Sequence, residues 1–147
     1  MRVGEKRRSR SALIYASIFG GILIISLFFV IRFIDKNAQV DTLVEVSDTS
    51  FEVMGLHGAA FGFDSISSVE LKDTMPAILE RTNGFAVDEV RKGSFVLEDL
   101  GECILYLTVE QGSYLYVKME DFYVIINFED SEKTVQLYDE LKDKTGK

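Results

Sequence analysis

Few side chains in this sequence have the type and spacing that binding or catalysis requires, and the clearest group is basic. Arg81, Arg91 and Lys92 form one basic cluster in a long acidic stretch, and Asn83 lies within the cluster in an Arg-Thr-Asn-Gly motif. Guanidinium and ammonium groups bind anionic oxygens. If a small anion or an acidic segment binds this chain, we expect it at Arg81, Asn83, Arg91 and Lys92. The alternative is a turn with a solvated arginine.

Other chemical signals are weak. His57 is the sole histidine and Cys103 the sole cysteine, so a zinc site has almost no ligands to draw on. Ser65, Ser67 and Ser68 lack the glycine frame of a nucleophile elbow and have no evident base. The carboxylates are scattered as on a solvated surface. We therefore predict no catalytic residue, no cofactor and no metal site.

A long apolar stretch positions the rest of the chain. Residues 12–31 contain no charged side chain, and a helix of that length is about 30 Å long, which matches the hydrocarbon core of a bilayer. This pattern predicts a transmembrane helix over residues 12–34 that contacts the lipid bilayer through residues 12–31. It follows a basic tail, residues 1–11, which we expect in the cytoplasm.

Charge asymmetry predicts the orientation. Residues 1–34 carry six basic and one acidic side chains, whereas residues 35–147 carry 10 and 23. The positive-inside bias favours a bacterial cell-membrane protein with a cytoplasmic N-terminus and an extracytoplasmic C-terminal domain. The apolar run is longer than that of most cleaved signal peptides and continues into Arg32, which favours an uncleaved signal anchor. A reversed topology stays open.

Small residues recur along one side of the predicted helix. Ala12, Ala16 and Gly20 are spaced every fourth residue, a pattern that lets two membrane helices approach closely. The sequence thus suggests a homodimer through these residues. The alternative is that small residues are common in membrane helices of any kind.

After a linker over residues 35–41, residues 42–147 have the pattern of one mainly β domain. Short apolar runs separated by turn residues predict seven or eight antiparallel strands in a meander or half-open barrel. A helix that starts near Asp130 or Ser131, with an apolar stripe that includes Val135, Tyr138 and Leu141, is expected to cap it. Lys72–Lys92 reads as an irregular loop, with a type I′ turn at Asn83 and Gly84.

Several short motifs resemble the bacterial PH (pleckstrin-homology-like) domain family. They are Met54–Gly58, Ile66–Leu71, Met75-Pro76, Arg81–Gly84, Lys92–Phe95 and Tyr123–Asn127. The resemblance implies a PH-like fold and a membrane setting, and it implies no defined ligand. The acidic surface departs from the plain form of that family.

Together these observations favour a non-catalytic protein- or peptide-binding module at the cell envelope. Edge strands of such a sheet can pair with a strand of a protein partner. The acidic charge argues against nucleic acid as a partner. Two alternatives stay open: a cell-surface sensor of a small ligand or cation, and an envelope enzyme or enzyme subunit.

Overall fold

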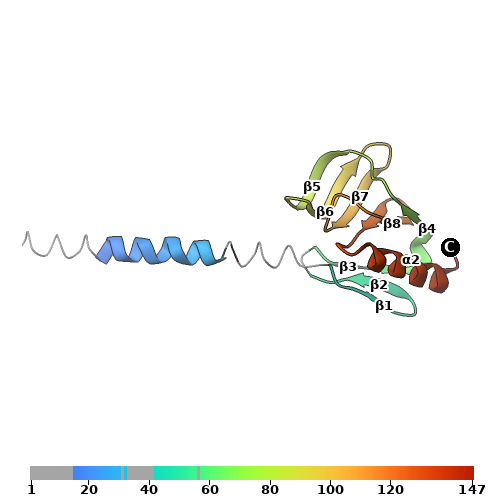
Figure 1. Cartoon of the computed structure of the whole chain (residues 1–147), viewed down its shortest axis with the longest axis horizontal. Coiled ribbons are helices and arrows are strands. Elements are labelled where there is room, and N and C mark those ends of the chain that lie inside the picture. The colour runs from blue at the N-terminus through green and yellow to red at the C-terminus, as the bar shows by residue number, and fades with distance from the viewer. Residues whose placement is uncertain (1–14, 31, 33–41, 56) are drawn as a thin grey trace, which may run out of the picture. The chain divides into compact units, whose positions relative to one another are not determined.

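The structure is a computed structural model that describes residues 15–30, 32, 42–55 and 57–147. The chain divides into two units, residues 1–38 and residues 39–147. The predicted basic tail over residues 1–11, the linker over residues 35–41 and Ala12 of the predicted dimer face lie outside the described residues. Figure 1 shows the described elements of both units.

The N-terminal unit contains an apolar helix. Residues 15–30 are helical, and the apolar side chains from Ile22 to Val30 are all at least half exposed. Within the described residues, no helix has both the length and the apolar character needed to cross a membrane. The structure therefore corrects the predicted transmembrane helix over residues 12–34.

The C-terminal unit is mainly β and ends in a helix. Its apolar runs and turn residues give nine strands, one short 3-10 helix and one α-helix in the described part of the chain. In chain order these elements are β1 (Val44–Val46), β2 (Ser50–Val53), β3 (Ala59–Gly62), η1 (Phe63–Ser65), β4 (Ile66–Lys72), β5 (Ile78–Val87), β6 (Val90–Leu97), β7 (Gly101–Leu107), β8 (Tyr114–Met119), β9 (Tyr123–Ile126) and α2 (Ser131–Thr145).

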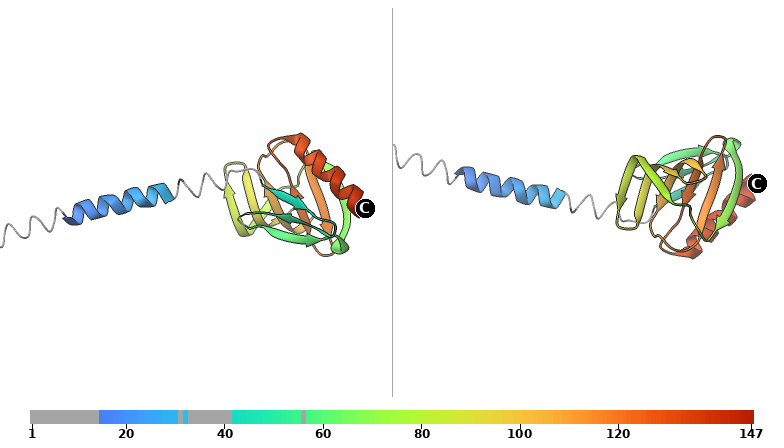
Figure 2. Two further views of the ribbon diagram at one scale, coloured as in Figure 1. Left: turned by 90° about the horizontal axis from the view of Figure 1, so that it is seen from below. Right: turned by 90° about the horizontal axis from the view of Figure 1, so that it is seen from above.

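The strands form two sheets. The smaller sheet has the order β1-β2-β3, and the larger has the order β4-β8-β9-β7-β6-β5 (Figure 2). The predicted antiparallel meander is wrong, because β9 lies between β8 and β7 and runs parallel to β7. In a meander, β9 would follow β8 and lie at an edge. Its position in the sheet interior instead buries Val124, Ile125 and Ile126 completely.

Alternation along the central strands builds two apolar clusters on opposite faces of the larger sheet. On β8, Leu115 and Val117 contribute to the first cluster, while Tyr114 and Tyr116 contribute to the second. The first cluster also contains side chains from β2, β3 and α2, so it joins the two sheets and the helix. This two-sided burial explains why the central strands read as continuous apolar runs rather than as alternating ones.

The predicted irregular loop over Lys72–Lys92 is mostly a β-hairpin. β5 pairs with β6 along its length, and Asn83 and Gly84 lie inside β5 instead of in a turn. The two-residue turn is at Asp88 and Glu89, where Asp88 has φ of 49°. Gly84 lies opposite Gly93, and a Cβ at Gly93 would be 2.6 Å from the Gly84 Cα. The glycine is therefore needed for a close backbone approach.

Helix α2 begins and ends with the expected caps. The Asp130 carboxylate accepts a hydrogen bond of 3.0 Å from the Glu132 N–H, and Gly146 ends the helix in the left-handed conformation. Leu137 and Leu141 are buried against the first cluster, and α2 packs on β4 and β8. The predicted stripe is partly wrong, since Val135 is 36% exposed, and Thr134 takes a buried position instead.

Candidate functional site

The structure separates the basic residues that the sequence groups. Arg81 is an exposed residue of β5 opposite Phe95, whereas Arg91 lies on β6 opposite Ala86, about five residues or 17 Å further along the hairpin. Asn83 lies opposite Ser94, and the Lys92 residue is buried, with 9% of its surface exposed. The four side chains are thus spread along one hairpin and do not converge on one ligand.

Arg91 is engaged with its own neighbourhood. Its guanidinium donates to the carbonyl oxygens of Asp88 and Val90, and it forms an ion pair with Glu110 at 3.2 Å. It lines a recess of about 440 Å³ together with Glu110, Tyr114 and the segment from Asp73 to Ile78. Because these bonds occupy several guanidinium donors, Arg91 has less capacity for an external anion than the sequence suggests.

The thiol of Cys103 and the phenol of Tyr106 are buried in the domain. Burial raises the pKa of the Cys103 thiol to about 11, so the thiolate is scarce near neutral pH. Burial also raises the pKa of Tyr106 to about 12, and the Tyr106 hydroxyl donates to the His57 carbonyl oxygen at 2.7 Å. In the described part of the chain, no group of three or more histidine, cysteine or acidic residues could hold a metal ion.

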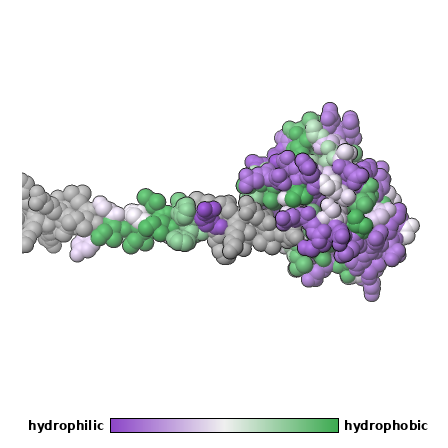
Figure 3. Space-filling model, in the orientation of Figure 1, coloured by the Kyte–Doolittle hydropathy of each residue, from purple (hydrophilic) through white to green (hydrophobic). Residues whose placement is uncertain are grey.

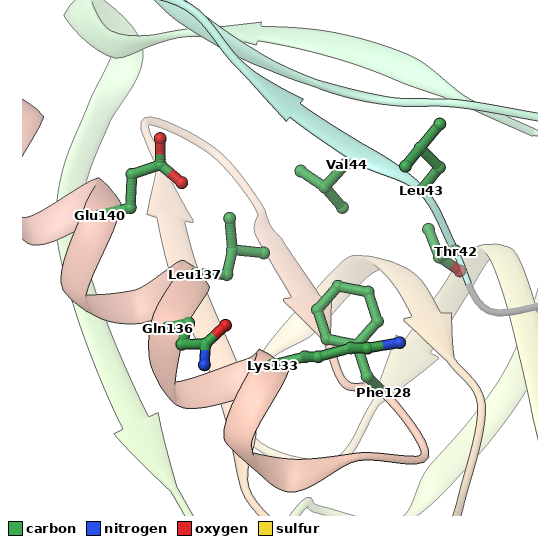
Figure 4. A pocket seen from close by; sticks show the side chains of 8 residues that line it. All are labelled: Thr42, Leu43, Val44, Phe128, Lys133, Gln136, Leu137 and Glu140. Atoms are coloured by element: carbon green, nitrogen blue, oxygen red, sulfur yellow. The ribbon is translucent and has the colours of Figure 1, made fainter.

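A groove between β1 and α2 is the better candidate site. It has a volume of about 460 Å³, within the range of ligand pockets. Figure 4 shows Val44 of β1 and Leu137 of α2 pointing toward each other across it, with Phe128 below. Its lining residues are Thr42, Leu43, Val44, Phe128, Lys133, Gln136, Leu137 and Glu140.

Local bonds hold the two walls of the groove in place. The Thr134 hydroxyl accepts a 3.2 Å hydrogen bond from the Phe128 N–H, which ties α2 to the end of the sheet. At the other end of α2, Lys144 donates to Asp48 in the β1–β2 turn at 2.9 Å. This ion pair lowers the pKa of Asp48 through a hydrogen bond and charge attraction. These two bonds connect α2 to the segment just after β9 and to the β1–β2 turn.

Along its open side, β1 has unused backbone groups. Leu43 and Ser47 form hydrogen bonds with β2 residues or their neighbours, Leu43 with Met54 and Ser47 with Ser50. Because antiparallel pairing alternates, the N–H and C=O of Val44 and Val46 point away from β2. Among the described residues, no strand pairs with this edge.

The groove combines an apolar floor with a polar rim. Phe128 and Leu137 are 7% exposed and form the floor, while Leu43 is 60% exposed at the side. The Thr42 hydroxyl, at one end, is buried and has no hydrogen-bond partner among the described residues. A buried hydroxyl without a partner costs about 1–3 kcal/mol, which a shift of the strand or a bound polar group could recover.

The sequence signal for this groove was faint. Lys133, Gln136 and Glu140 share one side of a predictable helix, and Leu43 is an apolar residue at an outward position of a predictable strand. Neither pattern indicates that the two elements lie side by side. Asn127 was also missed: it is buried, and its side-chain amide bonds to the Thr108 N–H and the Val109 carbonyl. Its role there is structural.

Comparisons with protein-family models, with curated proteins and with solved structures find no match to this chain. The resemblance to the bacterial PH domain family therefore stays a prediction.

Proposed function

We propose that the protein is a non-catalytic binding module that takes an extended segment of another protein as an added strand on β1. The observation that carries this proposal is the open edge of β1 beside the groove. Added strands gain affinity from main-chain hydrogen bonds and specificity from pockets for alternate side chains. Val44 and Val46 offer the backbone groups, and the groove offers the pocket.

The surface around the groove is consistent with a protein-binding role. On the face of the domain that Figure 3 shows, hydrophilic residues dominate and hydrophobic areas are small. The exposed side chain of Leu43, next to the buried floor of Phe128 and Leu137, is an apolar contact that a partner's side chain can cover. Apolar anchors surrounded by polar residues are typical of protein interfaces.

The cellular setting stays a prediction. The predicted residence at the outer side of a bacterial cell membrane rests on the charge asymmetry of the sequence, and no described helix supplies the membrane span that it requires. Fractionation of cells that make the full chain tests it. Recovery of the protein in the membrane fraction, with the C-terminal domain open to protease added outside the cells, is the expected result. Recovery with the cytosolic proteins would contradict it.

Selection of peptides tests the binding role. The full-length protein is used to select from a displayed library of random twelve-residue peptides. Gln136→Trp places a large side chain in the groove at an exposed position of α2, so it should block binding without unfolding the chain. We expect the selected peptides to bind this variant at least about tenfold more weakly, a loss of about 1.4 kcal/mol.

Asp139→Trp is the matched control, because Asp139 is an exposed residue of the same helix that does not line the groove. It should leave the affinity unchanged. Binding that survives Gln136→Trp, or a library that yields no binder, would overturn the proposed function.

A further inference from the structure

The outer face of the β1–β2 hairpin holds two carboxylates side by side. Glu45 lies directly opposite Glu52, and both side chains are exposed. Like charges at directly opposed positions of antiparallel strands repel each other. Within the described residues, neither Glu45 nor Glu52 forms an ion pair, so both carboxylates are uncompensated.

An added strand would bring a third residue into this row. On an antiparallel ladder, directly opposed side chains lie on the same face, with Cβ atoms about 4.5–5.5 Å apart. The residue that pairs opposite Glu45 on the open edge of β1 is therefore within reach of its carboxylate. A Lys or Arg side chain at this position would offset the repulsion between Glu45 and Glu52.

The next residue of the added strand faces the other way. Side chains alternate between the two faces of a strand, so the residue opposite Val44 points toward α2. There it meets Leu137 and Phe128, the buried floor of the groove. An apolar side chain fits this position, because it would cover the floor without leaving a polar group unpaired.

We infer that the segment bound on β1 carries a Lys or Arg opposite Glu45 and, in the adjacent position, an apolar side chain opposite Val44. This inference rests on the proposed function and names the chemistry of the partner. The charge of the domain acts in the same direction: residues 42–147 carry nine basic and 21 acidic side chains. A net charge of that sign speeds the encounter with a basic segment, and salt weakens the effect.

A charge-reversal experiment on the full chain tests the inference. Peptides selected from the random library by the wild-type protein should be enriched in an apolar residue next to a Lys or Arg. Glu45→Lys should lower the affinity of these peptides about fivefold. In a new selection it should shift the preferred residue at the basic position to Asp or Glu. Glu80→Lys makes the same change in net charge at an exposed position of β5, so it controls for long-range attraction.

The outcomes separate the inference from the proposed function. The inference stands if two results are found together. Gln136→Trp abolishes peptide binding, and Glu45→Lys changes the preferred charge of the bound peptide while Glu80→Lys does not. If Gln136→Trp abolishes binding but the peptides show no preference for a basic residue, or if the two lysine variants behave alike, the inference is overturned and the proposed function survives. If no selected peptide depends on the groove, the proposed function fails, and the inference fails with it.

Discussion

Two of the edge strands, β1 and β5, differ in both length and regularity. β5 has ten residues, and the side chains from Ile78 to Asn83 are all exposed, whereas β1 has three residues. Yet the pairing of β5 with β6 shifts register twice, once on each side of the Glu80-Arg81 pair. Register shifts and charged side chains are the means by which proteins protect an edge from unwanted pairing.

β1 is protected less than β5, since its only charged side chain is Glu45. It pairs with β2 without a register shift, and its open edge lies beside the groove lined by α2. A regular edge with an apolar groove next to it can accept a strand and select its side chains. An irregular edge in open solvent can do neither well. These differences favour β1 over β5 as the edge of the proposed binding site.

The largest expected effect on stability comes from a substitution in the β5–β6 hairpin. Gly93→Ala would place a Cβ 2.5 Å from the Asn83 carbonyl oxygen, at a residue with φ of 120°. Steric overlap with backbone and an unfavourable conformation should together lower the free energy of unfolding by about 3 kcal/mol or more. Urea denaturation of the full chain measures this change.

Gly62→Ala is the control for Gly93→Ala, because a Cβ at Gly62 meets open space and φ there is −70°. We expect it to change the free energy of unfolding by less than about 0.5 kcal/mol. Equal effects of the two substitutions would show that the backbones of β5 and β6 are not as close as described.

High pH should weaken the second apolar cluster, on one face of the larger sheet. Cys103 and Tyr116 belong to the second apolar cluster, and burial raises their pKa values to about 11 and about 12 from ordinary values of 9.0 and 10.0. The folded chain therefore keeps protons that the unfolded chain loses. This stability is fully present below pH 9 and is lost as the pH rises toward 11 for Cys103 and toward 12 for Tyr116.

Urea midpoints between pH 8 and pH 11, in the presence of a reducing agent, test this dependence. Cys103→Ala should make the decline with pH shallower, because it removes one of the titrating groups. An unchanged slope in Cys103→Ala would mean that the thiol titrates alike in the folded and unfolded chains.

A smaller effect is expected at the end of the groove. Thr42→Val removes a buried hydroxyl that has no hydrogen-bond partner among the described residues. Because no bond is lost, the free energy of unfolding should stay the same or rise by up to about 1 kcal/mol. Ser47→Ala is a useful contrast, since the Ser47 hydroxyl bonds to the Ser50 carbonyl at 2.9 Å and its loss should destabilise the hairpin. A loss of stability in Thr42→Val would show that the hydroxyl is bonded after all.

Local patterns in the sequence predicted most of the strands and the C-terminal helix. The apolar run from Tyr123 to Ile126 forms an interior strand of the larger sheet. Its parallel neighbour β7 could not be predicted, because an apolar run buried on both faces does not indicate which strands lie beside it. The predicted turn at Asn83 and Gly84 was wrong for a different reason. A glycine permits close backbone approach as well as tight turns, and only the position of the partner strand shows which of these two roles the glycine has.

The candidate site was harder to predict than the fold. Basic residues close in sequence, such as Arg81 and Arg91, suggested a ligand loop, but strand geometry spreads them along the hairpin. The groove instead combines Val44 with Leu137, which are far apart in the chain. Helix and strand patterns fix which side of each element is apolar, and they do not fix which elements meet.

Residue-resolved hydrogen exchange is the most direct test of the central claim that β1 is the binding edge. The amide exchange rates of the full chain are compared with and without a peptide selected by the wild-type protein. We predict that the amides of Val44 and Val46 slow at least about tenfold on binding, because each gains a main-chain hydrogen bond, while those of Glu80 and Arg81 on β5 do not change. Unchanged exchange at Val44 and Val46 in a peptide-saturated sample, or slowing along β5 instead, would contradict the account.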